Sequence, residues 1–200
     1  MSAAWHGGLA GADQYARNAV LTGAISSAMN FWFSRDFTLP ECLDQGGTSA
    51  CPCGTPGFWD PNWFSNVSCP EPSAQAHRPK LPVQVILIPE LVAESCLLFN
   101  SSLSPTQVNN CTFISARAYD TFYEGKGFLF GANTLDVARI GLDLALLTSN
   151  TTLVAEAYSR INAEIVIQPD DMVDGIKPDG SFSQHAGLLY NGHYGVVLYI

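Results

Sequence analysis

The sequence is organised as five stretches in which small and apolar residues recur at the spacing of an α-helix. These stretches are Ala12–Phe33, Val85–Phe99, Pro105–Phe122, Ala132–Leu147 and Thr151–Ile167. Before Gly180, no stretch alternates polar and apolar residues for long enough to form a useful strand. The pattern has no heptad repeat, so it favours an all-α scaffold, a toroid or a bundle, over a coiled coil.

Local signals mark several helix starts. Pro89 and Glu90 suit the first turn of the second helix, because Pro needs no donor there and Glu favours the positive end of the helix dipole. Ser104 and Pro105 form an N-cap and first-position pair for the third helix. Asp13 provides an acidic residue near the start of the first helix.

The composition limits the classes of partner. The 200 residues (21.5 kDa) are 47% hydrophobic and 14% charged, which is enough apolar material for a core and excludes a mainly disordered chain. The net charge of −9 does not indicate the positively charged surface that binds nucleic acid or an anionic membrane. No apolar run reaches the roughly 20 residues that span a bilayer. We therefore expect neither nucleic-acid nor membrane partners. We also expect a monomer.

Cysteines and glycosylation sequons indicate an extracellular glycoprotein with disulfides. The chain has six cysteines, which suggests an oxidising compartment. Four Asn-x-Ser/Thr sequons begin at Asn66, Asn100, Asn110 and Asn150. Met1–Ala10 lacks the basic start and apolar run of a signal peptide, so we expect this chain to be a piece of a longer secreted product. Cys96 and Cys111 could bridge neighbouring helices, although the pairing cannot be deduced.

The densest group of polar and aromatic side chains lies in residues 174–195. Five glycines there allow tight turns and close approach of a ligand. The stretch also carries His185, His193, Tyr190 and Tyr194. Loops with such groups on a helical scaffold often carry function, whereas the plainer interpretation is a glycine-rich turn whose Tyr and His cover the core.

Within this stretch, DGSFSQHAGLLYNGHYG resembles the signature of polysaccharide lyase family 8, in which a His and a Tyr-Gly pair are nine residues apart, as His185 and Tyr194 are here. Two upstream motifs occur in the family's order, namely Gly-Ala-Asn at 131–133 and Asn-Trp-Phe at 62–64, where the family has Asn-Trp-Trp. The cysteine-rich stretch CLDQGG…CPCGTPG…NWF is similar to the fungal branch of the family.

The resemblance implies an incomplete (α/α) toroid over residues 1–200, with the family's C-terminal β-sandwich region missing. It also implies cleavage of a uronic-acid-containing polysaccharide by β-elimination. Asn133 and His185 would contact the C6 carboxylate, and Tyr194 would act as base and then acid. No metal or cofactor is implied. The family has an arginine downstream of the tyrosine, which this chain does not reach. The remaining substrate-binding candidates are aromatic or amide residues of one loop: Trp59, Asn62, Trp63 and Phe64.

Alternatives remain open for the function and for one segment. A glycoside hydrolase would need two carboxyl groups, for which the loop offers Asp174 and Asp179, and a non-catalytic carbohydrate-binding fragment is also compatible. Alginate is the first choice of substrate for a fungal-type member, followed by hyaluronan, chondroitin or xanthan. Residues 67–84 interrupt the family pattern and are Pro-rich, so we interpret them as a retained intron, which transcript reads across them would refute.

A final expectation concerns charged residues of the fourth predicted helix. Asp136, Arg139 and Asp143 are spaced for ion pairs along one face. We expect this face to be solvated.

Overall fold

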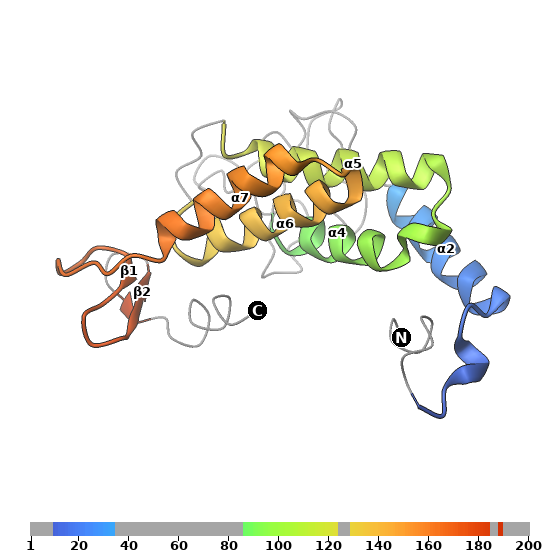
Figure 1. Cartoon of the computed structure of the whole chain (residues 1–200), viewed down its shortest axis with the longest axis horizontal. Coiled ribbons are helices and arrows are strands. Elements are labelled where there is room, and N and C mark those ends of the chain that lie inside the picture. The colour runs from blue at the N-terminus through green and yellow to red at the C-terminus, as the bar shows by residue number, and fades with distance from the viewer. Residues whose placement is uncertain (1–9, 35–85, 124–128, 185–187, 190–200) are drawn as a thin grey trace, which may run out of the picture. The chain divides into compact units, whose positions relative to one another are not determined.

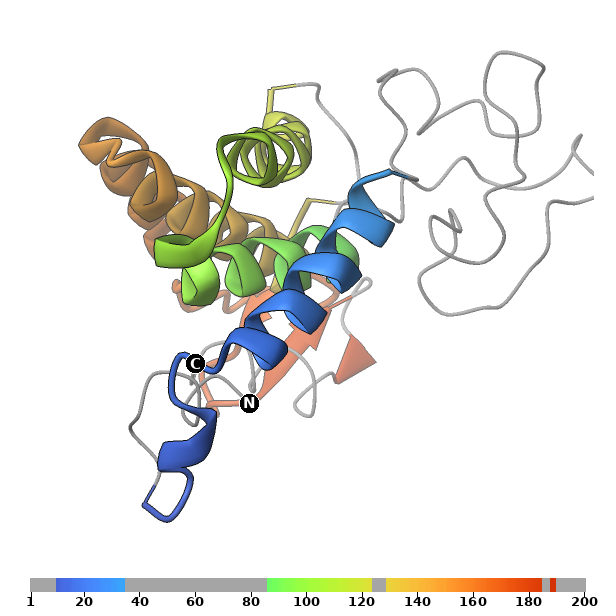
Figure 2. The ribbon, with the colours of Figure 1, turned by 90° about the vertical axis from the view of Figure 1, so that its right-hand side faces the viewer.

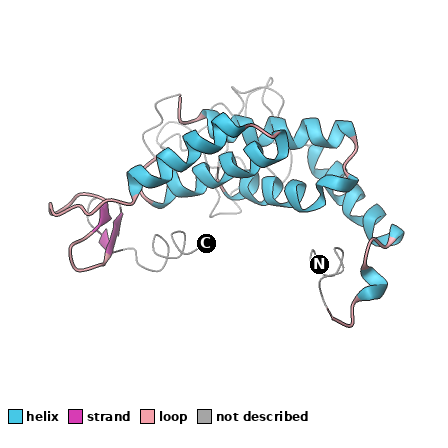
Figure 3. Cartoon of the chain, viewed as in Figure 1, coloured by secondary structure: helices cyan, strands magenta, loops and turns pink. Residues whose placement is uncertain are grey.

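The computed structural model describes residues 10–34, 86–123, 129–184 and 188–189, which are mainly helical (Figures 1 and 3). The order of elements is η1 (Asp13–Tyr15), α2 (Ala19–Phe33), α4 (Leu87–Phe99), η4 (Asn100–Ser102), α5 (Pro105–Asp120), α6 (Ala132–Thr148), α7 (Thr151–Glu164), β1 (Gly175–Ile176), β2 (Phe182–Gln184) and β3 (Leu188–Leu189). The all-α fold class is confirmed. None of the helices in these ranges is long and apolar enough to cross a membrane.

The first and the last predicted helices have shorter bounds than expected. Asn18 starts α2 late, because its side-chain Oδ1 accepts hydrogen bonds from the N–H groups of Val20 (2.9 Å) and Leu21 (3.2 Å). At the other end, α7 stops at Glu164. Ile167 instead makes an isolated bridge to Ile176 of β1, so it is not part of the helix.

The chain forms two compact units, one of residues 1–84 with 95–113 and the other of residues 85–94 with 114–200. In the first unit, Ser104 and Gln107 cap α5 reciprocally. The Ser104 N–H donates to Gln107 Oε1 (3.0 Å), and the Gln107 N–H donates to Ser104 Oγ (3.3 Å). Gln107 Nε2 also donates to Ser26 Oγ (2.9 Å) and Asn30 Oδ1 (3.0 Å) of α2. The predicted N-cap is therefore confirmed, and the same glutamine ties α5 to α2.

A disulfide joins the end of α4 to α5 within this first unit. Cys96 and Cys111 are paired, and both are fully buried. The bridge that the sequence left open is thus present in the structure.

The second unit is built on the hairpin of α6 and α7, which pack along each other (Figures 1 and 2). Ser149 ends α6 in the left-handed conformation, and Asn150 caps α7 by accepting a hydrogen bond from the Leu153 N–H (3.1 Å). The hydrophobic core gathers buried residues from the start of α4, the end of α5 and both hairpin helices: Ile86, Ala93, Ala118, Tyr119, Val137, Ile140 and Ala157. Val137 and Ile140 therefore place one face of α6 against this core.

A small antiparallel sheet follows α7 in the order β1-β2-β3. Gly175 pairs with Ser183, and Gln184 pairs with Leu188. The turn from β1 to β2 closes when the Lys177 N–H donates to the Ser181 carbonyl (2.8 Å) and the Gly180 N–H to the Lys177 carbonyl (2.9 Å). Gly180 has a φ of +82°, which favours glycine at this place. The sheet holds residues 182–184 of the signature stretch in place.

Candidate functional site

The structure describes one of the seven candidate site residues, Asn133. The other six lie outside the described residues and stay predictions: Trp59, Asn62, Trp63, Phe64, His185 and Tyr194. The retained-intron hypothesis for residues 67–84 also falls outside the described residues.

Asn133 is half-buried in the first turn of α6, where Gly131 is the N-cap. Gly131 has a φ of +57°, a conformation that side-chain-bearing residues rarely adopt. Its N–H donates to Glu164 Oε2 (3.0 Å) at the end of α7. Because the first turn is the positive end of a helix, Asn133 lies where an anionic group is favoured.

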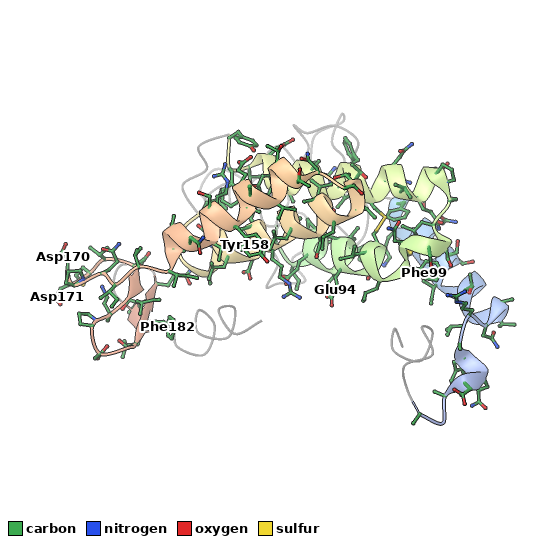
Figure 4. All side chains as sticks on the ribbon, viewed as in Figure 1. Glu94, Phe99, Tyr158, Asp170, Asp171 and Phe182 are labelled. Carbon is green, nitrogen blue, oxygen red and sulfur yellow. A yellow bond between two sulfur atoms is a disulfide. The ribbon has the colours of Figure 1, made fainter. Side chains whose placement is uncertain are left out.

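The Gly-Ala-Asn motif and the DGSFSQ segment meet in the folded chain. Phe182 of β2, labelled in Figure 4, packs against the buried pair Ala132 and Leu135. A Cβ added to Gly131 would lie 3.3 Å from Cδ of Gln184, so glycine leaves room for this glutamine. Two motifs about fifty residues apart in the sequence are thus in contact, as one site would require.

Gln184 has an unusual environment at this contact. The residue is 1% exposed, and its Oε1 accepts no hydrogen bond within the described part of the chain. The residue precedes His185 in the signature, yet sequence reasoning did not select it, and it did not select Glu164 either. Their proximity to Gly131 arises only when β2 and the end of α7 fold against α6.

Asp179 is committed to the β1–β2 turn. Its Oδ1 accepts from the Ser181 N–H (3.0 Å) and the Ser181 hydroxyl (2.7 Å). These hydrogen bonds hold the pKa of the fully exposed Asp179 carboxyl below its ordinary value. A low pKa is the opposite of what a general acid needs, so Asp179 is not suited to be the proton donor of a hydrolase built on Asp174 and Asp179.

The expectation of a solvated face on α6 is wrong. Asp136 is only 6% exposed, and Arg139 Nη1 donates to Glu90 Oε1 (2.8 Å) of α4 in a salt bridge. Burial, with a smaller contribution from Glu90, raises the pKa of Asp136 to about 7. Burial also raises the pKa of Asp143. The start of α4 covers this face, which spacing along a single helix could not reveal.

We expect Asp136→Asn to raise the free energy of unfolding at about pH 8 by on the order of 2 kcal/mol. The pKa of Asp136 is about 7 in the folded chain against an ordinary 3.8. A raised pKa means that the contribution of Asp136 to stability is fully present below about pH 4 and is lost as the pH rises through 7. The full shift would be worth roughly 4 kcal/mol, and we expect less because water can reach an ionised buried carboxyl.

Urea unfolding at about pH 4 and about pH 8 measures this effect. Asp171→Asn is the matched control, because it removes the same charge from an exposed loop. A gain of equal size at both pH values, or an equal gain in the control, would contradict the assignment to Asp136.

In the ranges that the structure describes, no three His, Cys, Asp or Glu side chains are grouped so that they could hold a metal ion. The arrangement found there is a helix N-terminus that carries an amide side chain, with the DGSFSQ segment packed beside it.

Two solved structures of Streptomyces coelicolor A3 chondroitin AC lyase are similar to this fold. One is a point mutant with a TM-score of 0.52 and 20% sequence identity, covering 98% of this chain and 30% of that chain. The other is a complex with chondroitin sulphate with a TM-score of 0.52 and 21% identity, covering 89% of this chain and 24% of that chain. The chain thus spans less than a third of their length. A search of curated proteins gave no match.

A family model provides the classification. The model described as "Polysaccharide lyase family 8, N terminal alpha-helical domain" matches residues 96–199, more than half of the chain. An α-helical domain agrees with the expected incomplete toroid. The matched residues include both the Gly-Ala-Asn motif and the DGSFSQ segment, whose contact is described above. The chain therefore belongs to polysaccharide lyase family 8.

Proposed function

We propose that this chain forms part of the catalytic domain of a secreted lyase that cleaves a uronic-acid-containing polysaccharide by β-elimination. The contact between the Gly-Ala-Asn motif and the DGSFSQ segment is the observation that carries the proposal. It brings the turn that carries Asn133 next to the strand that leads into His185. Membership of the family and the likeness to a chondroitin AC lyase fold support the same reaction class.

The proposed chemistry assigns one role to each catalytic candidate. Removal of the C5 proton of a uronate builds negative charge on its C6 carboxylate, and neutral donors stabilise that charge. Asn133 would donate its amide to the carboxylate at the positive end of α6, and His185 would make a second contact near C5. Tyr194 would take the C5 proton and then protonate the leaving glycosidic oxygen. The products would be a reducing end and an end with a C4–C5 double bond.

The proposed substrate class is an anionic polysaccharide. One of the similar solved structures is a complex with chondroitin sulphate, and the family resemblance adds alginate, hyaluronan and xanthan. Trp59, Asn62, Trp63 and Phe64 would bind sugar rings by stacking and amide contacts. The fungal-type assignment and the extracellular location belong to the same proposal.

A substrate screen tests the reaction class. The complete natural chain that contains this sequence is incubated with each polyuronate while the ultraviolet absorbance of the unsaturated uronate is recorded. We expect absorbance to rise with at least one polymer, in step with new reducing ends. New reducing ends without absorbance would indicate hydrolysis, and no products from any polymer would favour a non-catalytic binding protein.

A further inference from the structure

Tyr123 is an exposed aromatic residue that is held in place. It lies just beyond α5, and the residue is 61% exposed. Its hydroxyl donates to Glu156 Oε1 of α7 (2.7 Å), and its N–H donates to the Asp120 carbonyl (2.9 Å). Arg160 of α7 lies over the ring, with Cζ 5.3 Å from the centroid.

The groups beneath Tyr123 form a packed ion pair. Arg160 Nη2 donates to Glu156 Oε1 (2.6 Å), so the two charges compensate each other. Arg160 Nε donates to the hydroxyl of the buried Tyr119 (3.2 Å), and its Cζ lies 4.1 Å from the Phe122 centroid. The hydrogen bonds from Tyr123 and Arg160 lower the pKa of Glu156, which stabilises its ionised form. Glu156 therefore remains an acceptor that fixes the Tyr123 hydroxyl.

Packing between helices explains most of the contacts around Arg160, but it does not explain why the ring of Tyr123 is exposed. Tyr119, Phe122 and Arg160 join the end of α5 to α7, and their contacts with one another do not need an exposed Tyr123. A mobile surface tyrosine would lose side-chain entropy on binding a ligand, whereas this ring is already oriented. Its hydroxyl, its edge contact with Tyr119 and the overlying guanidinium all restrict it. An open, oriented aromatic surface suits the apolar face of a sugar ring.

The position of Tyr123 along the chain agrees with this use. Tyr123 lies ten positions before Asn133, so the two are within about 35 Å of each other even if the connection were fully extended. A polysaccharide that reached Asn133 would extend over several sugar units and could contact both places. We infer that Tyr123 is a stacking residue of a sugar-binding subsite and that Glu156 and Arg160 are its positioning residues. This inference takes its ligand class from the proposed function.

Direct binding measurements separate the subsite from catalysis. Size-defined oligosaccharides of chondroitin sulphate, hyaluronan and alginate are titrated by calorimetry into the complete natural chain. We expect Tyr123→Ala to weaken binding of the preferred oligosaccharide about 5- to 10-fold, a loss within the range that one aromatic contact accounts for. Tyr123→Phe keeps the ring and loses the hydroxyl's bond to Glu156, so we expect a loss of about 2-fold.

Tyr158→Ala is the matched control. Tyr158 is 54% exposed on α7 (Figure 4) and lies two residues from both Glu156 and Arg160, so it projects from another face of the helix. We expect its affinity for the preferred oligosaccharide to equal that of the wild type. The subsite would be overturned if Tyr123→Ala bound the oligosaccharide as tightly as the wild type, or if Tyr158→Ala lost as much affinity as Tyr123→Ala.

Turnover distinguishes failure of the subsite from failure of the proposed function. On a polymer that the wild type cleaves, Tyr123→Ala should raise KM about 5- to 10-fold and change kcat less than about 2-fold. A wild type that binds oligosaccharides through Tyr123 but cleaves none would refute only the lyase activity. If the wild type cleaves a polymer and Tyr123→Ala cleaves it with the same KM, only the subsite would be refuted. A wild type that neither binds nor cleaves any of these ligands would refute both.

Discussion

Tyr194→Phe should lower kcat/KM for the preferred polyuronate by about 10³- to 10⁴-fold, because one phenol is proposed to serve as both base and acid. Phenylalanine keeps the ring and removes the hydroxyl that is proposed to transfer the proton, so binding should change little. The measurement is the rate of ultraviolet absorbance increase at several substrate concentrations. A fall in kcat with an unchanged dissociation constant is the expected form of the loss.

Tyr190→Phe is the control for this substitution. It removes a phenol hydroxyl from the same stretch, four residues earlier, and should retain most of the wild-type rate. If Tyr194→Phe kept more than about a tenth of the wild-type kcat, general acid–base catalysis by Tyr194 would be excluded. Hydrolysis that survives in Tyr194→Phe would favour the carboxylate mechanism instead.

Gly141→Ala should lower the free energy of unfolding by about 2 to 3 kcal/mol, because α6 has no room for a methyl group at this position. An added Cβ would lie 2.4 Å from Cδ2 of Tyr119 and closer still to its Cε2. The Tyr119 ring is buried, packs edge-on against Phe122 at 5.1 Å and accepts a hydrogen bond from Arg160. The ring therefore cannot move without disturbing the core between α5, α6 and α7.

Gly23→Ala provides the matched control for the stability measurement. Gly23 is inside α2, and a Cβ added there meets nothing within 4 Å. Alanine is a better helix former than glycine, so this variant should gain about 0.5 to 1 kcal/mol. Urea unfolding followed by circular dichroism compares the two. A Gly141→Ala variant as stable as the wild type would show that Tyr119 does not pack on Gly141 in solution.

Helix positions follow from short-range chemistry, which explains why they could be predicted. Ser104 and Gln107 are three residues apart and form their capping box from local atoms alone. Asn18 is the exception that was overlooked: its cap shifts the start of α2 to Ala19, although the residue type itself signals a cap.

The contacts of the candidate site were harder to predict because they join distant parts of the chain. The signature motifs identified Asn133 as a candidate, but they carried no information on the Glu164 carboxylate that accepts from the Gly131 N–H or on the buried amide of Gln184. Both reach α6 from other elements, α7 and β2. The burial of Asp136 was missed for the same reason, because α4 covers it.

Residue type and spacing therefore settle which segments of this chain are helices, which motifs it shares with polysaccharide lyase family 8 and which residues are candidates for proton transfer. Those features depend on atoms within one or two helical turns or on the order of motifs along the chain. Which carboxyl groups are buried, which glycines tolerate no side chain and how Tyr123 is held depend on groups that meet only after folding. A side chain's solvation and its close contacts come from all the elements around it, so the tertiary structure alone decides them.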